Sequence, residues 1–269
     1  MRKCFTINPM RTKEEFKSFM TLLEDNTYQA IEIFNPFRQS LEQQKDYTDS
    51  VKEIKEKYPN TEIVLHLPHS KIDGLCLDEH LNIGSLQVMK DSADYAAQFG
   101  VKKLTLHLGL IDLSIDRHVY VDKVIPILQE LCDFVSKNNQ NIMIENMPGK
   151  HELGYSPDEL YEIITRVDRK NLKFIFDTGH AHCSEYNDTD FLYKLKDYLF
   201  HIHYNDNDST RDAHTRIGSG TIDFDKHFKA LKDINYNQLH CMEVIYKDVN
   251  DLRTYAEDLK KYEDILWNI

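Results

Sequence analysis

Ionisable side chains stand at or just beyond the ends of six short β-branched runs in this sequence. They are His66, His107, Glu145, Asp177, His203 and Glu243. So many ionisable groups crowded together would repel one another and resist burial without a compensating cation. Imidazole and carboxylate ligands without thiolate suit Zn²⁺, Mn²⁺, Fe²⁺ or Co²⁺. One such residue alone is more often structural, but the whole set predicts a divalent-metal site.

Two further segments add ligand types to this set. In Asp177-Thr178-Gly179-His180, a carboxylate and an imidazole lie close together, and Gly179 permits a tight bend. In Asp212-Ala213-His214, the Asp-x-His spacing can place both side chains toward one ion. The Gly218-Ser219-Gly220 that follows is open to two interpretations. It either lets backbone approach a substrate phosphate or hydroxyl, or it forms a flexible turn.

Eight strand-like runs must position these residues, and longer amphipathic stretches separate them. The runs are Lys3–Ile7, Ala30–Ile33, Glu62–His66, Lys103–His107, Asn141–Glu145, Lys173–Asp177, Leu199–His203 and Gln238–Glu243. Helical spacing of apolar residues marks Thr12–Glu24, Leu81–Phe99 and Val119–Val135. Thr12, Ser156 and Asp223 are expected helix N-caps.

Strands that alternate with helices indicate a parallel sheet. Eight such units in 269 residues predict an α/β fold, a single-domain (β/α)8 TIM barrel over residues 1–269. A doubly wound open sheet is the alternative, but the first turn, Asn8-Pro9-Met10, lacks the glycine-rich pattern of that fold. The carboxyl ends of barrel strands converge on one face, so the six strand-end residues are expected to meet there.

Eight of the 13 histidines need separate treatment. Five lie in expected helices, loops or non-terminal positions, where packing or solvated roles are typical: His80, His118, His151, His227 and His240. His69 and His182 stay undecided. His201 shares an expected strand with His203, and we expect it to face away from the barrel interior.

Composition narrows the function further. The net charge of −12 disfavours broad, non-specific attraction to nucleic acid or to anionic membranes. Hydrophobic content is 41%, and no apolar run approaches a membrane span. The start of the sequence has no signal-peptide pattern, so a cytoplasmic location is expected. Five widely spaced cysteines make neither a disulfide framework nor a thiolate zinc site: Cys4, Cys76, Cys132, Cys183 and Cys241.

Several segments resemble the xylose-isomerase-like barrel superfamily, which holds sugar isomerases, sugar 3-epimerases and endonuclease IV. The resemblance runs from the first strand to Glu243. The most specific segments are Ile144-Glu145-Asn146, Phe176-Asp177-Thr178-Gly179-His180-Ala181, His203-Tyr204-Asn205-Asp206 and Asp212-Ala213-His214.

Similarity to the isomerases and epimerases implies one divalent metal, Zn²⁺ or Mn²⁺, held by Glu145, Asp177, His203 and Glu243. In these relatives the two glutamates also act as acid and base. They move a proton at the carbon beside a carbonyl through an enediolate. The resemblance therefore implies a sugar or sugar-phosphate isomerase or epimerase, which is our leading hypothesis. A small-molecule partner follows from it, and no membrane partner is expected.

Similarity to endonuclease IV implies five more ligands and up to three zinc ions. The matching residues are His66, His107, His180, Asp212 and His214. The alternative hypothesis is thus a metal-dependent phosphodiesterase, an abasic-site endonuclease acting on nucleic acid. In an isomerase, His66, His107, His180 and His214 would instead bind the substrate.

Departures from both patterns remain. Epimerases usually have an arginine near the place of His214, whereas the first-strand Gly-x-His-x-Ser of the nuclease is replaced by Thr6-Ile7-Asn8-Pro9. A third hypothesis is a non-catalytic barrel that keeps a metal, but the intact glutamate pair argues against it. The sequence leaves the oligomeric state open.

Overall fold

Eight parallel strands close into one barrel in chain order in the computed structural model, which describes residues 1–69, 74–75, 77–78 and 80–267. The strands are β1 (Arg2–Ile7), β2 (Ala30–Phe34), β3 (Glu62–His66), β4 (Lys103–Leu106), β5 (Asn141–Glu145), β6 (Leu172–Asp177), β7 (Leu199–Tyr204) and β8 (Leu239–Met242). Strand β8 pairs in parallel with β1 and closes the ring. The predicted single-domain TIM barrel is confirmed.

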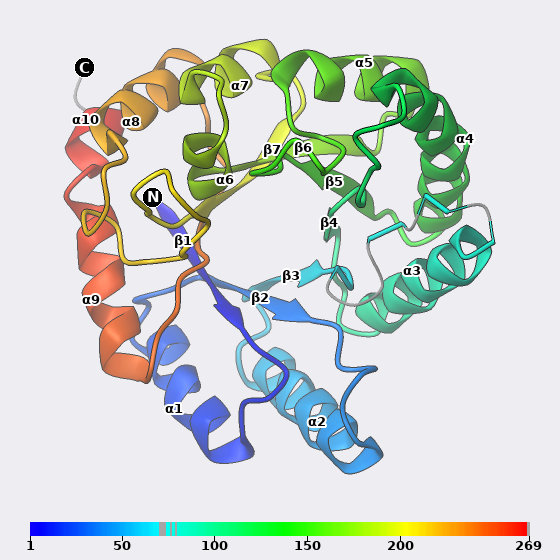
Figure 1. The fold of residues 1–269 in the computed structure, drawn as a ribbon. Coiled ribbons are helices and arrows are strands. Elements are labelled where there is room, and N and C mark those ends of the chain that lie inside the picture. Colours follow the sequence, from blue (N-terminus) through cyan, green and yellow to red (C-terminus); the bar gives the residue numbers. More distant parts are fainter. Residues whose placement is uncertain (70–73, 76, 79, 268–269) are drawn as a thin grey trace.

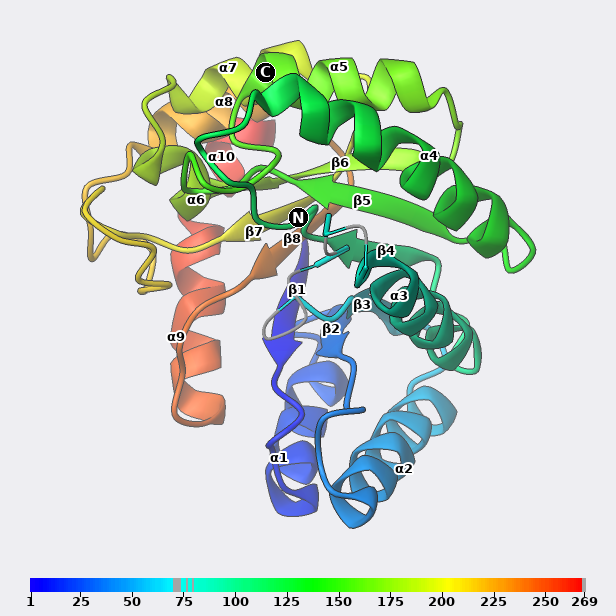
Figure 2. The same ribbon diagram turned by 45° about the vertical axis from the view of Figure 1, so that its right-hand side comes forward.

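Helices surround the strands on the outside, as Figures 1 and 2 show. They are α1 (Lys13–Glu24), α2 (Leu41–Lys57), α3 (Asn82–Ala97), α4 (Arg117–Ser136), α5 (Pro157–Val167), α6 (Thr178–Cys183), α7 (Asp188–Lys194), α8 (Phe224–Asp233), α9 (Val249–Lys260) and α10 (Glu263–Trp267). Three predicted N-caps are confirmed, since the side chains of Thr12, Ser156 and Asp223 each accept a hydrogen bond from a backbone N–H of the first turn.

The barrel interior has two layers, an apolar lower layer and, nearer the carboxyl ends of the strands, a polar upper layer. The lower layer packs Cys4, Ala30, Val64, Met143, Ile175, Leu239 and Cys241 into one buried cluster. Side chains of a strand alternate between its two faces, so the residue two positions later also points inward. On five of these strands that residue is polar: Thr6, Glu32, His66, Glu145 and Asp177. The alternation of side chains along the strands therefore places the ionisable groups in a layer directly above the apolar one.

The prediction for His201 was wrong. His201 is fully buried, and its Nε2 atom lies 3.0 Å from Glu32 Oε2, across the barrel on β2. The physical reason is the same alternation, because residues i and i+2 of a strand share a face. His201 therefore points into the interior beneath His203.

Two further predictions concern the cysteines and the membrane. Cys4, Cys132, Cys183 and Cys241 carry free thiols, and Cys76 lies outside the described residues. Among the helices of the described part of the chain, none combines the length and the apolar character that a bilayer crossing requires.

Candidate metal centre

An inner group of four predicted ligands meets at the carboxyl end of the barrel. Glu145, Asp177, His203 and Glu243 each offer one ligand atom, and these four atoms lie within 4.8 Å of one another. The Nδ1 atom of His203 lies 3.1 Å from Glu145 Oε1 and 2.9 Å from Glu243 Oε2. The first three side chains are fully buried, while Glu243 is 14% exposed. Two glutamates thus approach one imidazole nitrogen, Glu145 from the end of β5 and Glu243 from the position after β8.

The remaining predicted ligands form two outer groups beside the inner one. The first consists of His66, His107 and Glu145, and the second of His180, Asp212 and His214. In each group the ligand atoms also lie within 4.8 Å of one another. Glu145 joins two groups because its Oε2 atom lies 3.0 Å from His107 Nε2, while its Oε1 atom faces His203. All nine residues predicted from the sequence are therefore brought together.

Backbone carbonyls orient three of the outer histidines. The Nδ1 atoms of His66, His180 and His214 lie 2.8 Å, 2.8 Å and 2.9 Å from the carbonyl oxygens of Leu67, Asn146 and Glu243. Donation of Nδ1–H to these oxygens leaves Nε2 as the nitrogen that can bind an ion once it has lost its own proton. That nitrogen faces the group: His180 Nε2 and His214 Nε2 lie 3.2 Å and 2.8 Å from Asp212 Oδ2.

Two asparagines hold Asp177, one through its backbone and the other through its carboxylate. The Asn146 side chain accepts from the backbone N–H of Asp177 at 2.8 Å and donates to its carbonyl oxygen at 2.9 Å. Asn205 Nδ2 donates to Asp177 Oδ2 at 2.8 Å. Gly179 follows within α6, where a Cβ atom would lie 1.8 Å from Asn205 Oδ1. The absent side chain is thus required for close packing against Asn205, rather than for the tight bend predicted.

The loop that carries Asp212 and His214 is anchored by a buried carboxylate. Asp206 Oδ2 accepts the backbone N–H groups of Gly218 and Gly220 at 2.8 Å and 2.9 Å. Asp206 itself is fully buried. These glycine amides therefore already donate hydrogen bonds within the loop, so they are not available to bind a substrate phosphate.

The pKa shifts of the cluster residues show that its buried carboxylates are stabilised by nearby positive charge. Burial raises the pKa of Asp177 to about 6, against the pull of His180. Burial lowers the pKa of His214, but Asp212 and Glu243 outweigh it and raise that pKa to about 10. The carboxylates around His180 and His203 likewise raise the pKa values of both imidazoles well above normal, despite their burial. Protonated histidines thus supply the cationic charge that metal ions would supply.

The donor set fits divalent cations. Asp212 Oδ1 is buried and has no hydrogen-bond partner among the described residues, which is costly for a carboxylate oxygen without an ion. Imidazole nitrogens and carboxylate oxygens at these separations match Zn²⁺ or Mn²⁺ chemistry. Within the described parts of the chain, the three groups contain no cysteine.

Two residues near the cluster were missed or left undecided in the sequence. Glu32 is fully buried in the middle of β2, not at its end, so the strand-end criterion passed over it. The only signal was a single charge inside the apolar run Ala30–Phe34. His69, left undecided, has its ring centroid 4.5 Å from that of His66 and 4.8 Å from that of His107.

The other histidines lie away from the cluster. His182 Nε2 lies 2.8 Å from Thr221 Oγ1. His80, His118 and His151 are exposed, and His227 and His240 are buried among aromatic side chains. The packing or solvated roles predicted for these last five are consistent with these positions.

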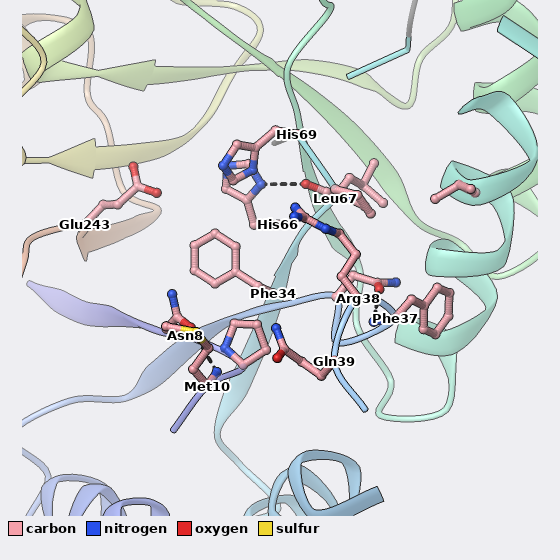
Figure 3. A pocket seen from close by; sticks show the side chains of 14 residues that line it. Asn8, Met10, Phe34, Phe37, Arg38, Gln39, His66, Leu67, His69 and Glu243 are labelled. Atoms are coloured by element: carbon pink, nitrogen blue, oxygen red, sulfur yellow. Dashed lines mark hydrogen bonds between the residues drawn. The ribbon is translucent and has the colours of Figure 1, made fainter. Parts of the chain in front are cut away.

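A cavity of about 580 Å³ opens beside the cluster on the side of β1, β2 and β3. Two of its lining residues, His66 and Glu243, belong to the ligand groups, and Asn8, Phe34 and Arg38 line it elsewhere (Figure 3). The rings of Phe34 and His66 stack with centroids 5.0 Å apart. A small polar molecule with one apolar face can reach the ligand groups through this cavity.

Comparisons with known proteins identify relatives over most of the chain. The family model described as "Xylose isomerase-like TIM barrel" matches residues 21–265. Uncharacterized protein MJ1311 of Methanocaldococcus jannaschii is 30% identical over 220 residues, which cover 80% of this chain and 74% of that protein. A probable endonuclease 4 of Staphylococcus aureus is 31% identical over 204 residues, covering 68% of this chain and 67% of that protein.

One solved structure matches this chain over nearly its whole length. The crystal structure of a D-tagatose 3-epimerase-like protein superimposes with a TM-score of 0.81 at 27% identity. The match covers 99% of this chain and 98% of that chain.

Proposed function

Because this chain belongs to the xylose isomerase-like TIM barrel family, we propose that it is a divalent-metal-dependent isomerase or epimerase of a sugar or sugar phosphate. The observation that carries the proposal is the pair Glu145 and Glu243, which approach His203 Nδ1 from the carboxyl ends of two strands at 3.1 Å and 2.9 Å. The similarity to a D-tagatose 3-epimerase-like protein supports the substrate class.

The inner group holds the ion in this proposal, with Glu145, Asp177, His203 and Glu243 as ligands. A divalent cation bound there, Zn²⁺ or Mn²⁺, would polarise a substrate carbonyl and stabilise an enediolate. Glu145 and Glu243 accept and return the proton at the neighbouring carbon. Burial opposes their ionisation, but His203 outweighs it and holds the pKa values of both carboxyl groups below normal, so both are available as bases.

The outer histidines and the cavity bind the substrate. The cavity beside Glu243 and His66 holds about 580 Å³, which is ample for a hexose or its phosphate. His66 and His107 lie 3.8 Å and 3.0 Å from Glu145 Oε2, and His180 lies 3.6 Å from Glu145 Oε1. His214 lies 4.0 Å from Glu243 Oε2. Imidazoles in these places can hydrogen-bond substrate hydroxyl or phosphate oxygens.

Replacement of either glutamate tests the proposal. Glu145→Gln and Glu243→Gln keep the size of the side chain but cannot act as bases, so we expect loss of turnover by about 10²–10⁴-fold. Turnover is measured on a panel of ketoses and ketose phosphates, with thermal unfolding to show that the barrel persists. Glu14→Gln, an exposed change on α1, serves as the control. A glutamine variant with normal turnover, or a wild type inactive on the whole panel, would contradict the proposal.

A second candidate function is favoured by the way the nine ligands divide. They form three groups of ligand atoms, and Glu145 belongs to two of them, an arrangement that could hold up to three ions. The similarity to a probable endonuclease 4 supports a phosphodiesterase that cleaves abasic-site DNA. Elemental analysis separates the two, since about one ion per chain favours the isomerase and about three favour the phosphodiesterase. The nuclease would also incise abasic duplex DNA and lose that activity on chelation.

A further inference from the structure

A buried carboxylate lies directly beneath the inner group, outside every ligand set described above. Glu32 on β2 is fully buried, and its Oε2 atom lies 2.8 Å from His203 Nε2 and 3.0 Å from His201 Nε2. Its other oxygen accepts a hydrogen bond from Thr105 Oγ1 on β4 at 2.9 Å. No two of the strands β2, β4 and β7 are neighbours in the ring, so this hydrogen-bond network crosses the barrel interior.

The orientation of His203 differs from that of three other ligand histidines. His66, His180 and His214 point Nδ1 at a backbone carbonyl and Nε2 toward their group. His203 points Nε2 at a side chain, Glu32, and Nδ1 toward Glu145 and Glu243. A side-chain substitution leaves a backbone carbonyl in place, whereas a substitution of Glu32 removes the hydrogen-bond partner of His203.

We propose that Glu32 is a positioning residue for the inner metal ligand His203. Its carboxylate accepts Nε2–H of His203 and thereby fixes both the ring orientation and the tautomer, leaving the Nδ1 lone pair for the ion. Thr105 in turn fixes the carboxylate. The inference rests on the proposed function only in that the inner group binds a metal.

A deep metal site is the competing explanation. Glu32, His201, His203 and Cys241 also have ligand atoms within 4.8 Å of one another. Positioning fits the contacts better, because both oxygens of Glu32 already accept hydrogen bonds from matched donors. Burial also raises the pKa of the Cys241 thiol well above normal, and only a thiolate is a good metal ligand.

Two matched variants separate positioning from structural support. Glu32→Met removes the acceptor of His203 Nε2–H, while His201→Met removes the neighbouring donor to the same oxygen and leaves the contact between Glu32 and His203 in place. Both replace a fully buried polar group by an apolar one, so both lower stability. Only the first frees His203. Glu32→Gln is a third, nearly isosteric variant that retains an acceptor oxygen but removes the charge.

The experiment titrates metal-free full-length protein with Zn²⁺ in competition with a chromophoric chelator and records thermal unfolding of each metal-free variant. We expect Glu32→Met to weaken the binding of one zinc ion by about 10–100-fold and Glu32→Gln to weaken it less. His201→Met should bind zinc with the affinity of the wild type. Equal affinity in Glu32→Met and wild type would overturn the inference, as would an equal loss in His201→Met or a wild type that binds no zinc. Should Glu32→Met not fold, wild-type affinity in Glu32→Gln would overturn it. A wild type that binds zinc but turns over no sugar would contradict the proposed function alone.

Discussion

At the scale of residues, the candidate ligands were predictable because each stands at a strand end or in the loop that follows. Glu145 ends the apolar run of β5, His203 lies near the end of β7, and in a parallel barrel those ends meet. Glu32 was not predictable in this way, because its partner His201 was assigned to the wrong face and a single mid-strand charge has many structural explanations. The contact between β2 and β7 exists only in the closed barrel.

Metal binding should release protons from the histidines of the cluster. Surrounding carboxylates raise the pKa values of His180 and His203 well above normal and that of His214 to about 10, which favours the protonated imidazoles in the metal-free protein. A metal ligand must lose its proton. We expect about three protons per chain released if the group of His180 and His214 fills together with the inner group, and about one if the inner group fills alone.

Calorimetric titrations with zinc in buffers of different ionisation enthalpy measure this number. Zinc binding without proton release at pH 7.5 would contradict the assigned histidine ligands.

At the scale of elements, the strands and three helix caps followed from hydrophobic periodicity and capping residues, while the loop contacts did not. Sequence spacing placed Gly179 near Asp177 and His180 but not against Asn205. The partner of Gly218 and Gly220 is Asp206, more than ten residues earlier, and only the folded loop brings them together. Such contacts depend on backbone paths that periodicity does not encode.

Gly179→Ala should weaken both the fold and the metal site. The added Cβ would lie 1.8 Å from Asn205 Oδ1, and Asn205 donates to the Asp177 carboxylate. We expect a loss of about 1–3 kcal/mol in the free energy of unfolding, together with weaker zinc binding. Urea unfolding and chelator competition measure the two effects.

Gly84→Ala is the matched control, because it lies in α3 and a Cβ there meets nothing within 4 Å. This change should leave zinc binding intact and raise stability by up to about 1 kcal/mol. Similar losses in both variants would argue against the role of the contact with Asn205.

At the scale of the whole molecule, the barrel combines an apolar floor with a charged rim. Chain length and the number of alternating strand and helix units were sufficient to predict the barrel, whereas the apolar layer inside it was not predicted. The same packing buries histidines that carry no proposed chemistry. His240 lies inside an aromatic stack, with its Nδ1 atom 3.0 Å from the Tyr204 hydroxyl oxygen.

His240 should make the fold sensitive to acid. Burial lowers its pKa to about 3, so below the ordinary value near 6.5 the unfolded chain binds a proton that the folded chain does not. Its contribution to stability is complete above about pH 6.5 and falls by about 1.4 kcal/mol per pH unit as the pH drops toward 3. His240→Phe keeps a ring but cannot titrate, so its free energy of unfolding should fall less steeply between pH 6.5 and pH 5. Parallel curves from urea unfolding would contradict the assignment.

Proton transfer by Glu145 and Glu243 is tested most directly by hydrogen exchange with solvent. Metal-loaded protein is incubated in D₂O with ketohexoses and ketose phosphates, and NMR follows the hydrogen on the carbon beside the carbonyl. We predict that deuterium replaces this hydrogen in at least one substrate with the wild type, and not with Glu145→Gln or Glu243→Gln. No incorporation into any of these sugars, together with metal-dependent incision of abasic-site DNA, would contradict the isomerase assignment.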